Sequence, residues 1–381
     1  MTNVQRLQEL GQSIWYDNIS RPLIRGGELA RHVEEGLTGV TSNPTIFDKA
    51  ITGGNDYDDE IREILERQPK ITSAGLIQAL MITDIQQACD VLTGVYERTG
   101  GRDGFVSIEV APGKARDTRA TVEEVRFLWS RVNRKNLMIK IPATKEGLPA
   151  IEQCVAEGVN INITLIFAVQ RYREVAIAYL SGLERRLREG KPIAGVASVA
   201  SVFVSRIDTL VDEMLQAKGS SMPPADATRI SALAGRAAVA NTKMVYQVFR
   251  EIFEGPRFKA LAQKGAALQR PLWGSTGTKN PRYSDLHYVD PLIGRHTVNT
   301  VPPVTYHAIL DHGTPKLTIE SELDAARAVL HDVEVLGISM DAVTTKLEQD
   351  GVAAFEKSFD ALSRSLENKR REFAAEAVPR G

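Results

Sequence analysis

The sequence contains little cysteine, little net charge and no long apolar run. Cys89 and Cys154 are the only cysteines among 381 residues, and their spacing fits neither a disulfide framework nor a metal-binding motif. We therefore expect two free thiols, as in a reducing cytoplasm. The formal net charge is −1, without the basic excess that nucleic-acid-binding proteins carry. Any anion-binding site must therefore be local.

Targeting segments are missing as well. No apolar run approaches the ~18 residues of a transmembrane helix, and the N-terminal residues MTNVQRLQELGQSIW contain no signal-peptide core. No GxGxxG motif follows the first expected strand, which removes the commonest sign of a dinucleotide-binding fold. The composition, with 43% hydrophobic and 25% charged residues, is that of a globular protein. We expect it in the cytoplasm, bound to neither membranes nor nucleic acid.

Short apolar runs that are typical of strands alternate with helical patterns along most of the chain. We predict eight strands, at Ser13–Asp17, Gly39–Asn43, Phe105–Val110, Leu137–Ile141, Asn160–Phe167, Ala194–Phe203, Pro271–Ser275 and Thr297–Val301. Regular alternation favours a parallel sheet, and eight repeats favour a closed (β/α)8 barrel of the TIM type over an open sheet. The prediction is one α/β domain over residues 1–381.

Three segments are longer than a simple strand–helix unit. Helical insertions are predicted at about 48–104 and about 207–270, the second with a linker-like stretch, AKGSSMPP, at Ala217–Pro224. A C-terminal helical extension is predicted at about 317–376, ending in a long helix with one apolar stripe formed by Phe355, Phe359, Leu362 and Leu366. Between the third and fourth strands, Thr121 and Glu124 match a capping box and predict the start of a helix.

In four of the predicted strands, a polar side chain shares a face with the residue two positions further on. Successive side chains of a strand point to opposite faces, so each of the following pairs shares a face: Thr41 and Asn43, Ser107 and Glu109, Asn162 and Thr164, Ser201 and Phe203. Barrel interiors are normally packed with branched aliphatic side chains, and buried polar groups are costly. A lumen lined in this way predicts a functional site.

Lys140 lies in the apolar strand pattern Leu-Met-Ile-Lys-Ile-Pro, where lysine is rarely buried without a function. Burial disfavours the ammonium form, and a neutral amine is the nucleophile of Schiff-base catalysis. A lysine whose ammonium reaches solvent from the end of the strand is the alternative that this residue alone leaves open. Lys145 follows in a Thr-Lys-Glu-Gly loop and is expected to be solvated.

Two carboxylates end strands of the predicted barrel. Asp17 ends the first strand and Glu109 lies near the end of the third. Two carboxyl groups close to one lysine can serve as acid and base if their environments separate their pKa values. For Asp17 a turn or helix cap is the structural alternative.

Residues after the late strands predict a phosphate site, and the histidines predict no metal site. Arg206 follows the sixth strand, and the Gly/Ser/Thr turn with Ser275 and Lys279 follows the seventh; loops at these places in barrels commonly hold phosphate. His307 and His312 lie five residues apart, but no cysteine or carboxylate pattern joins them at metal-ligand spacing.

Several of these motifs together resemble the transaldolase family, in its longer bacterial branch. They are KIPAT at Lys140, GVTSNPT at Gly39, NITLIF at Asn162, SVFVSRID at Ser201 and the loop WGSTGTKNP at Trp273. The resemblance implies a barrel enzyme in which Lys140 carries a dihydroxyacetone unit as a Schiff base. It further implies that Asp17 takes the proton of the donor's C4 hydroxyl, and that Glu109 and Thr164 hold a water that shuttles protons.

The resemblance also implies the substrates and their ligands. Sedoheptulose 7-phosphate and glyceraldehyde 3-phosphate would give erythrose 4-phosphate and fructose 6-phosphate, without metal or organic cofactor. Asn43 and Asn162 would bind substrate hydroxyls, Arg206 would grip the phosphate, and Thr41, Ser107 and Ser201 would line the pocket. Other branches carry a second arginine after the seventh strand. Here Lys279 is the nearest cation, which binds phosphate as a point charge without the bidentate fork of arginine.

Two rival functions differ in testable ways. Fructose 6-phosphate aldolases of the same superfamily release free dihydroxyacetone; they carry tyrosine where this chain has Phe203 and glutamine where it has Glu109, so both residues favour transaldolase. A barrel that has lost catalysis and serves as a scaffold or binding protein is disfavoured by the intact set Asp17, Glu109, Lys140, Asn162 and Thr164. The sequence leaves a monomer and a homodimer both open.

Overall fold

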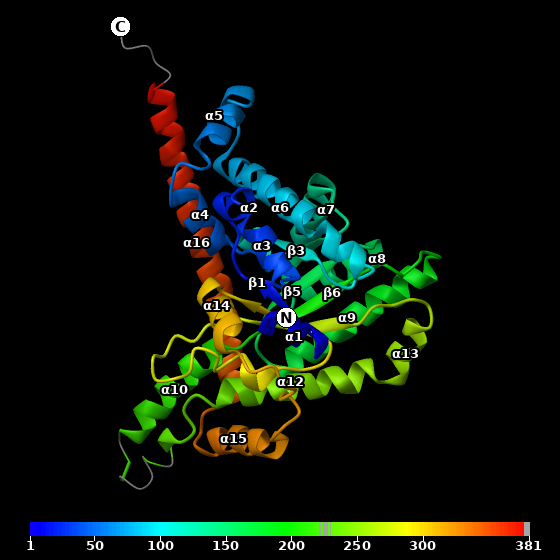
Figure 1. The fold of residues 1–381 in the computed structure, drawn as a ribbon, viewed down its shortest axis with the longest axis vertical. Helices are drawn as coiled ribbons and strands as arrows, with labels where there is room; N and C mark the ends of the chain where they lie inside the picture. The colour runs from blue at the N-terminus through cyan, green and yellow to red at the C-terminus, as the bar shows by residue number, and fades with distance from the viewer. Residues whose placement is uncertain (221, 224–227, 229, 377–381) are drawn as a thin grey trace.

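A computed structural model describes residues 1–220, 222–223, 228 and 230–376. Eight parallel strands follow one another around a closed barrel, and β8 pairs with β1 to complete it (Figure 1). The strands are β1 (Gln12–Tyr16), β2 (Gly39–Thr41), β3 (Phe105–Glu109), β4 (Leu137–Pro142), β5 (Ile161–Ile166), β6 (Ser198–Phe203), β7 (Gln269–Gly274) and β8 (Thr297–Val301). The predicted (β/α)8 barrel is confirmed, and every predicted strand is present.

The strand ends differ from the prediction for local reasons. β2 stops at Thr41 because Asn43 leaves the strand and caps the following helix, accepting a hydrogen bond from the Ile46 amide. β6 begins at Ser198 instead of Ala194 because Gly195 turns the chain with a φ of 85°, a conformation that glycine adopts readily.

Helices cover the outside of the barrel (Figure 1). They are α1 (Asn3–Glu9), α2 (Arg21–Arg25), α3 (Glu28–Glu34), α4 (Pro44–Thr52), α5 (Asp58–Arg67), α6 (Ser73–Arg98), the short 3-10 helix η1 (Pro112–Lys114), α7 (Thr118–Val132), α8 (Gly147–Glu157), α9 (Val169–Arg188), α10 (Ser205–Gly219), α12 (Ala237–Phe253), α13 (Pro256–Ala262), the 3-10 helix η2 (Asp290–Leu292), α14 (Pro303–His312), α15 (Leu323–Val335) and α16 (Met340–Glu376). Helices α4 to α6 lie in or next to residues 48–104, α10, α12 and α13 lie within or close to residues 207–270, and α15 and α16 lie within residues 317–376. Ser221 and Pro224 of the predicted linker lie outside the described residues.

The capping box predicted at Thr121 is wrong. Helix α7 begins at Thr118, because the side chain of Asp117 accepts a hydrogen bond from the Ala120 amide and caps the helix earlier. The Thr121 hydroxyl donates to the backbone carbonyl of Lys114, and Glu124 pairs with the Lys114 ammonium at 3.1 Å. Both side chains therefore fix α7 to the turn before it.

Inside the barrel, apolar side chains form a layer on the N-terminal side of the polar side chains that face the lumen. A small core separate from the main one is formed by Trp15, Phe105, Met138, Ala197, Val199, Leu272 and Val298. A Cβ atom on Gly39 would come within 2.5 Å of the Trp15 ring, so glycine on β2 leaves room for this large side chain. The main core lies between the strands and the helices.

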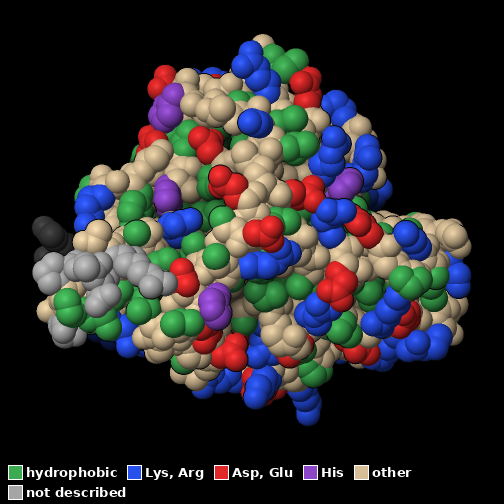
Figure 2. Space-filling view, turned by 90° about the horizontal axis from the view of Figure 1, so that it is seen from below, with side chains coloured by type: hydrophobic (Ala, Val, Ile, Leu, Met, Phe, Trp, Pro, Cys, Tyr) green, Lys and Arg blue, Asp and Glu red, His purple; other side chains and the backbone are tan. Residues whose placement is uncertain are grey.

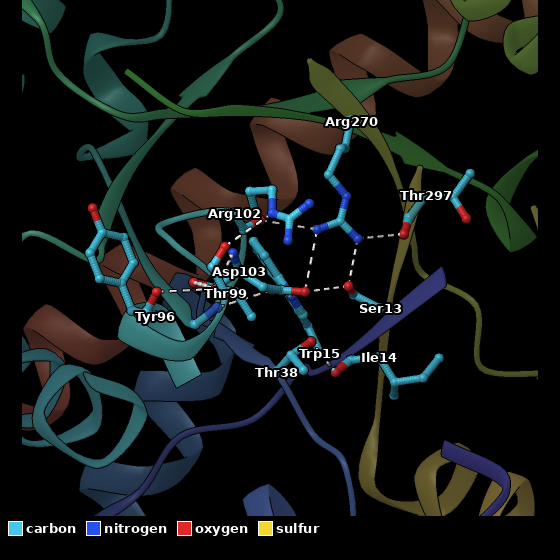
Figure 3. A network of polar contacts seen from close by, with 11 residues as sticks. Ser13, Ile14, Trp15, Thr38, Tyr96, Thr99, Arg102, Asp103, Arg270 and Thr297 are labelled. Carbon is cyan, nitrogen blue, oxygen red and sulfur yellow. Dashed lines mark hydrogen bonds and ion pairs between the residues drawn. The ribbon is translucent and has the colours of Figure 1, made fainter. Parts of the chain in front are cut away.

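A polar network closes the N-terminal end of the barrel (Figure 3). The buried carboxylate of Asp103, just before β3, accepts hydrogen bonds from the Ser13 hydroxyl and from Trp15 Nε1, the latter at 2.8 Å. Arg270 pairs with Asp103 at 3.3 Å and donates to the Thr297 carbonyl at 2.7 Å. The network joins β1, β7 and β8 to the chain before β3. Because active sites of such barrels lie at the opposite end, we assign it to stability.

The surface carries both signs of charge. Acidic and basic side chains are interspersed on the face shown in Figure 2, in keeping with the net charge of −1. Within the described part of the chain, no helix is long and apolar enough to cross a membrane.

Candidate active site

A cavity of about 100 Å³ opens at the C-terminal ends of the strands, above the polar layer of the lumen. It is lined by Asp17, Thr41, Asn43, Lys140, Thr164, Ser201, Phe203, Arg206, Leu272, Gly274, Ser275, Thr300 and Phe355. Most of the predicted site residues are therefore brought together. This end of a barrel is where catalytic side chains gather.

Lys140 lies at the centre of the polar layer. The register of β3 and β4 sets Lys140 beside Glu109, and Nζ lies 3.3 Å from Glu109 Oε2 and donates to the Ser42 carbonyl at 3.0 Å. Only 5% of Lys140 is exposed, so the ammonium does not reach bulk solvent. Lys145 is exposed, as expected.

Both carboxyl groups near Lys140 take up protons more readily than usual. Burial raises the pKa of Glu109 and of Asp17, and the positive charge of Lys140 offsets part of the increase in each. Asp17 accepts a hydrogen bond from the Thr41 hydroxyl at 2.7 Å. Asp17 does not cap helix α2, because Ser20 does so.

Asn162 is held beneath the cavity wall by two serines. Its amide nitrogen donates to Ser107 Oγ at 3.0 Å, and its carbonyl oxygen accepts from Ser201 Oγ at 2.6 Å. Ser107 and Asn162 are fully buried, and neither borders the cavity. In this arrangement β3 and β5 turn these short polar groups towards each other, and a role of Ser107 in lining the pocket stays a prediction.

Two buried oxygen atoms of the site are poorly satisfied. Neither Thr164 Oγ1 nor Glu109 Oε2 has a hydrogen-bond partner within the described residues. Glu109 Oε2 has only its ion pair with the Lys140 ammonium at 3.3 Å. Buried polar groups are nearly always paired. Both atoms are thus available to a small polar ligand beside Lys140. Asn43 differs, since its carbonyl oxygen already caps α4 and its amide N–H groups remain for a ligand.

Two cations lie near the cavity on the β6 and β7 side. Arg206 is half-buried at the start of α10, with its guanidinium carbon 5.3 Å from the centre of the Phe203 ring. Desolvation lowers the pKa of Arg206, while Asp350 counteracts it. Desolvation, and then the charge of Arg206, lower the pKa of Lys279. The two positive groups therefore act on each other, an arrangement that favours a bound anion.

The serines between these cations join the two loops. Ser205 Oγ and Ser275 Oγ lie 3.1 Å apart, and the Ser205 amide donates to the Ser275 carbonyl. Ser275 has a φ of 53°, which turns the chain away from β7. Lys279 does not line the central cavity. It lies instead on a neighbouring cavity of about 770 Å³ beside α10.

Some lining residues were not anticipated. Thr300 Oγ1 lies 2.5 Å from Thr41 Oγ1; strand alternation in β8 would have found it, since it shares a face with the buried Val298. Phe355 comes from α16. The apolar stripe of this helix predicts that Phe355 is buried, but it does not predict which part of the protein Phe355 packs against. The Ser42 carbonyl could not be found from side-chain patterns.

His307 and His312 each contact other side chains of the protein. The His307 ring packs 6.0 Å from His32 and 5.8 Å from Tyr306 between ring centres. His312 contacts the carboxylates of Asp285 and Asp311 at the surface. In the described ranges, no group of three or more His, Cys, Asp or Glu residues is arranged to hold a metal ion.

Comparison with known proteins agrees with this geometry. The family model described as Transaldolase/Fructose-6-phosphate aldolase matches residues 14–366. A transaldolase of Thermobifida fusca is 47% identical over 361 residues, covering 94% of this chain and 96% of the relative. A transaldolase of Thiobacillus denitrificans is 44% identical over 363 residues, covering 95% and 99%. Transaldolase 2 of a Nostoc species is 44% identical over 375 residues, covering 97% and 98%.

Proposed function

Because the chain belongs to the transaldolase/fructose-6-phosphate aldolase family, we propose that it transfers a dihydroxyacetone unit through a Schiff base on Lys140. The donor is sedoheptulose 7-phosphate and the acceptor glyceraldehyde 3-phosphate, giving erythrose 4-phosphate and fructose 6-phosphate. The observation that carries the proposal is the buried Lys140 ammonium, 3.3 Å from Glu109 in the cavity at the C-terminal end of the barrel.

Schiff-base formation begins with loss of a proton from Lys140. Glu109 is placed to accept it, and its raised pKa suits it to hold that proton. The neutral amine attacks the ketose carbonyl carbon, and the resulting carbinolamine loses water to give the iminium. Glu109 and the Thr164 hydroxyl would hold the water that carries these protons, which agrees with their unsatisfied oxygens.

Carbon–carbon cleavage then requires a base at the C4 hydroxyl. Asp17, oriented by Thr41, takes that proton; the C3–C4 bond breaks, its electron pair enters the iminium and the aldose leaves. The raised pKa of Asp17 makes it a stronger base than an exposed carboxylate. The enamine left on Lys140 attacks the acceptor aldehyde by the reverse steps. The Asn43 amide and the Ser201 hydroxyl, which line the cavity, would bind hydroxyls of the substrate. Asn162 would bind one only after giving up its hydrogen bond with Ser107 or Ser201.

The phosphate group would be bound at Arg206. Its guanidinium has no hydrogen bond or ion pair to another described residue. The backbone N–H of Arg206 itself would add a donor at the start of α10, because the N–H groups of Ser205 and Ile207 already bond to the carbonyls of Ser275 and Val204. Ser275 and the ammonium of Lys279 complete the site. Lys279 contributes at longer range, because it borders the neighbouring cavity.

Transfer is favoured over simple aldol cleavage by two residues. Phe203 presents an apolar ring to the cavity, where a tyrosine hydroxyl would offer a proton to the enamine. Glu109 lies against Lys140, where a glutamine would not accept its proton. The full-length similarity to proteins named transaldolase points the same way.

The experiment is to trap the intermediate. Borohydride added with fructose 6-phosphate should inactivate the enzyme and add one reduced three-carbon unit to Lys140, detected by peptide mass. Exposed Lys145 serves as the internal control. Mass on Lys145, or on no lysine, would remove the assignment. Chelators should not change the rate, and we propose that no metal or organic cofactor takes part.

We further propose that the enzyme works in the cytoplasm, in keeping with the free, buried thiols of Cys89 and Cys154. Its partners would be small sugar phosphates, and a monomer and a homodimer remain alternatives.

A further inference from the structure

One residue in the cavity wall comes from outside the barrel. Every other lining residue belongs to a strand or to the segment that directly follows one, whereas Phe355 belongs to α16, near the C-terminus. The Phe355 side chain is 5% exposed. The barrel is thus closed at this point by a ring that its own strands do not supply.

Helix α16 is fixed on both sides of Phe355. Before it, Glu348 lies 3.4 Å from Arg171 of α9, the helix that follows β5. After it, the Ser358 hydroxyl lies 2.7 Å from the Thr45 hydroxyl of α4, the helix that follows β2. Figure 1 shows α16, in red, running beside α4. The helix therefore spans from one side of the barrel mouth to the other.

A glycine lets α16 approach the strands closely. A Cβ atom on Gly351 would come within 2.8 Å of Leu165 Cδ2. Leu165 itself has a φ of 59° where the pairing of β5 with β6 shifts register. Gly351 precedes Phe355 by about one helical turn, so this contact sets how deeply the ring reaches over the cavity.

The cavity is small for the reaction. Its volume is about 100 Å³, whereas pockets that enclose small molecules usually measure roughly 300–1,000 Å³. Such a space holds only a few waters beside Lys140. The enamine formed on Lys140 is sensitive to such waters. If its nucleophilic carbon takes a proton, water adds to the iminium carbon, the carbon–nitrogen bond breaks, the amine returns to Lys140 and free dihydroxyacetone leaves.

We infer that Phe355 is a specificity-determining residue that shields the enamine from water, so that dihydroxyacetone is transferred to an aldehyde instead of being released. This inference rests on the Schiff base proposed on Lys140. It assigns to the C-terminal helix a part in choosing between the two reactions known in the family's description, transaldolase and fructose-6-phosphate aldolase. The ring acts by excluding solvent, without supplying or removing a proton.

The test compares two phenylalanines of the same helix. Phe359 lies about one turn beyond Phe355, is partly buried and does not border the cavity. Full-length Phe355→Ala, Phe355→Leu and Phe359→Ala proteins are given fructose 6-phosphate with erythrose 4-phosphate. Sedoheptulose 7-phosphate and free dihydroxyacetone are measured, and the ratio of release to transfer is compared with that of wild type.

We expect the ratio of release to transfer to rise at least about tenfold in Phe355→Ala, because the missing ring admits water to the enamine. A tenfold change in rate corresponds to only a small change in barrier height. In Phe355→Leu, which keeps part of the apolar cover, the ratio should rise severalfold. Phe359→Ala should keep the wild-type ratio. An unchanged ratio in both Phe355 variants, or an equal rise in Phe359→Ala, overturns the inference. Borohydride labelling of Lys140 in the same proteins separates the two proposals. Labelling with an unchanged ratio rejects only the role of Phe355, and absence of labelling in wild type rejects the Schiff base itself.

Discussion

Removal of the Arg206 guanidinium tests the phosphate site most directly. The guanidinium forms no ion pair with a carboxylate of the described chain, so Arg206→Ala leaves no buried carboxylate unpaired. A hydrogen bond to a charged group contributes about 1.5–3 kcal/mol, which corresponds to a loss of about ten- to a hundredfold in affinity. The contact with the Phe203 ring at 5.3 Å is weaker and acts equally with and without substrate. We therefore expect kcat/KM for fructose 6-phosphate to fall by that factor.

The assay measures kcat/KM for a phosphorylated and an unphosphorylated donor, fructose 6-phosphate and fructose. Only the first should lose efficiency. Arg173→Ala is the matched control, because Arg173 pairs with Glu251 on the surface away from the cavity. Lys279→Ala should lower kcat/KM for the phosphorylated donor by a smaller factor. That factor should shrink further as salt is added, since exposed charges are screened by ions. Equal losses for both donors in Arg206→Ala would refute the reasoning and make Arg206 a structural residue.

Four further outcomes are expected. Phe203→Tyr adds a hydroxyl to a cavity-lining ring and should lose transfer activity while releasing free dihydroxyacetone; wild-type transfer without release would make Phe203 a packing residue. Glu109→Gln removes the proton acceptor 3.3 Å from Lys140, so borohydride trapping should become slower, and an unchanged trapping rate would contradict that role. Asp103→Ala leaves Arg270 without its partner in a largely buried pair and should lower the free energy of urea unfolding by roughly 3–5 kcal/mol. Burial raises the pKa of Asp208 to about 7, so the folded chain keeps a proton that the unfolded chain loses near pH 4; stability should fall as pH rises from about 4 to 7, by up to about 4 kcal/mol, and melting curves of Asp208→Asn should show a flatter dependence.

The barrel could be predicted because each strand carries its own apolar run. Each of the eight runs could be recognised independently of the others, and their alternation with helices predicted a parallel sheet. Strand ends were less predictable. Whether Asn43 extends β2 or caps α4 depends on the Ile46 amide, and the sequence offers both. Likewise Thr121 and Glu124 match a capping box, but Asp117 lies close enough to cap the helix first.

Residues of the candidate site could be predicted where the alternation of side chains along one strand decides which of them face the lumen. Thr41, Thr164 and Ser201 were found in this way, and Thr300 was open to the same argument, whereas Lys140 was found as a lysine within an apolar run. Parity does not reveal which polar groups pair with each other, so the hydrogen bond between Asn162 and Ser107 could not be foreseen. The position of Phe355 depends on where α16 crosses the barrel. That path is set by long-range contacts such as Gly351 with Leu165, which have no local signal.

The apolar layer of the lumen belongs to the chemistry as much as to the fold. On β1, alternation sets Ser13 in the lower network, Trp15 in the apolar layer and Asp17 in the cavity. The Trp15 layer separates the polar groups around Lys140 from those at the N-terminal end, and Phe203 and Phe355 border them from above. Low polarity on both sides disfavours charge, which is the cause of the raised pKa of Asp17 and Glu109. In the proposed mechanism, Asp17 exchanges a proton with the C4 hydroxyl of the sugar, and Glu109 exchanges one with Lys140 through the water that it holds with Thr164; the apolar side chains above and below would keep bulk solvent from both carboxyl groups.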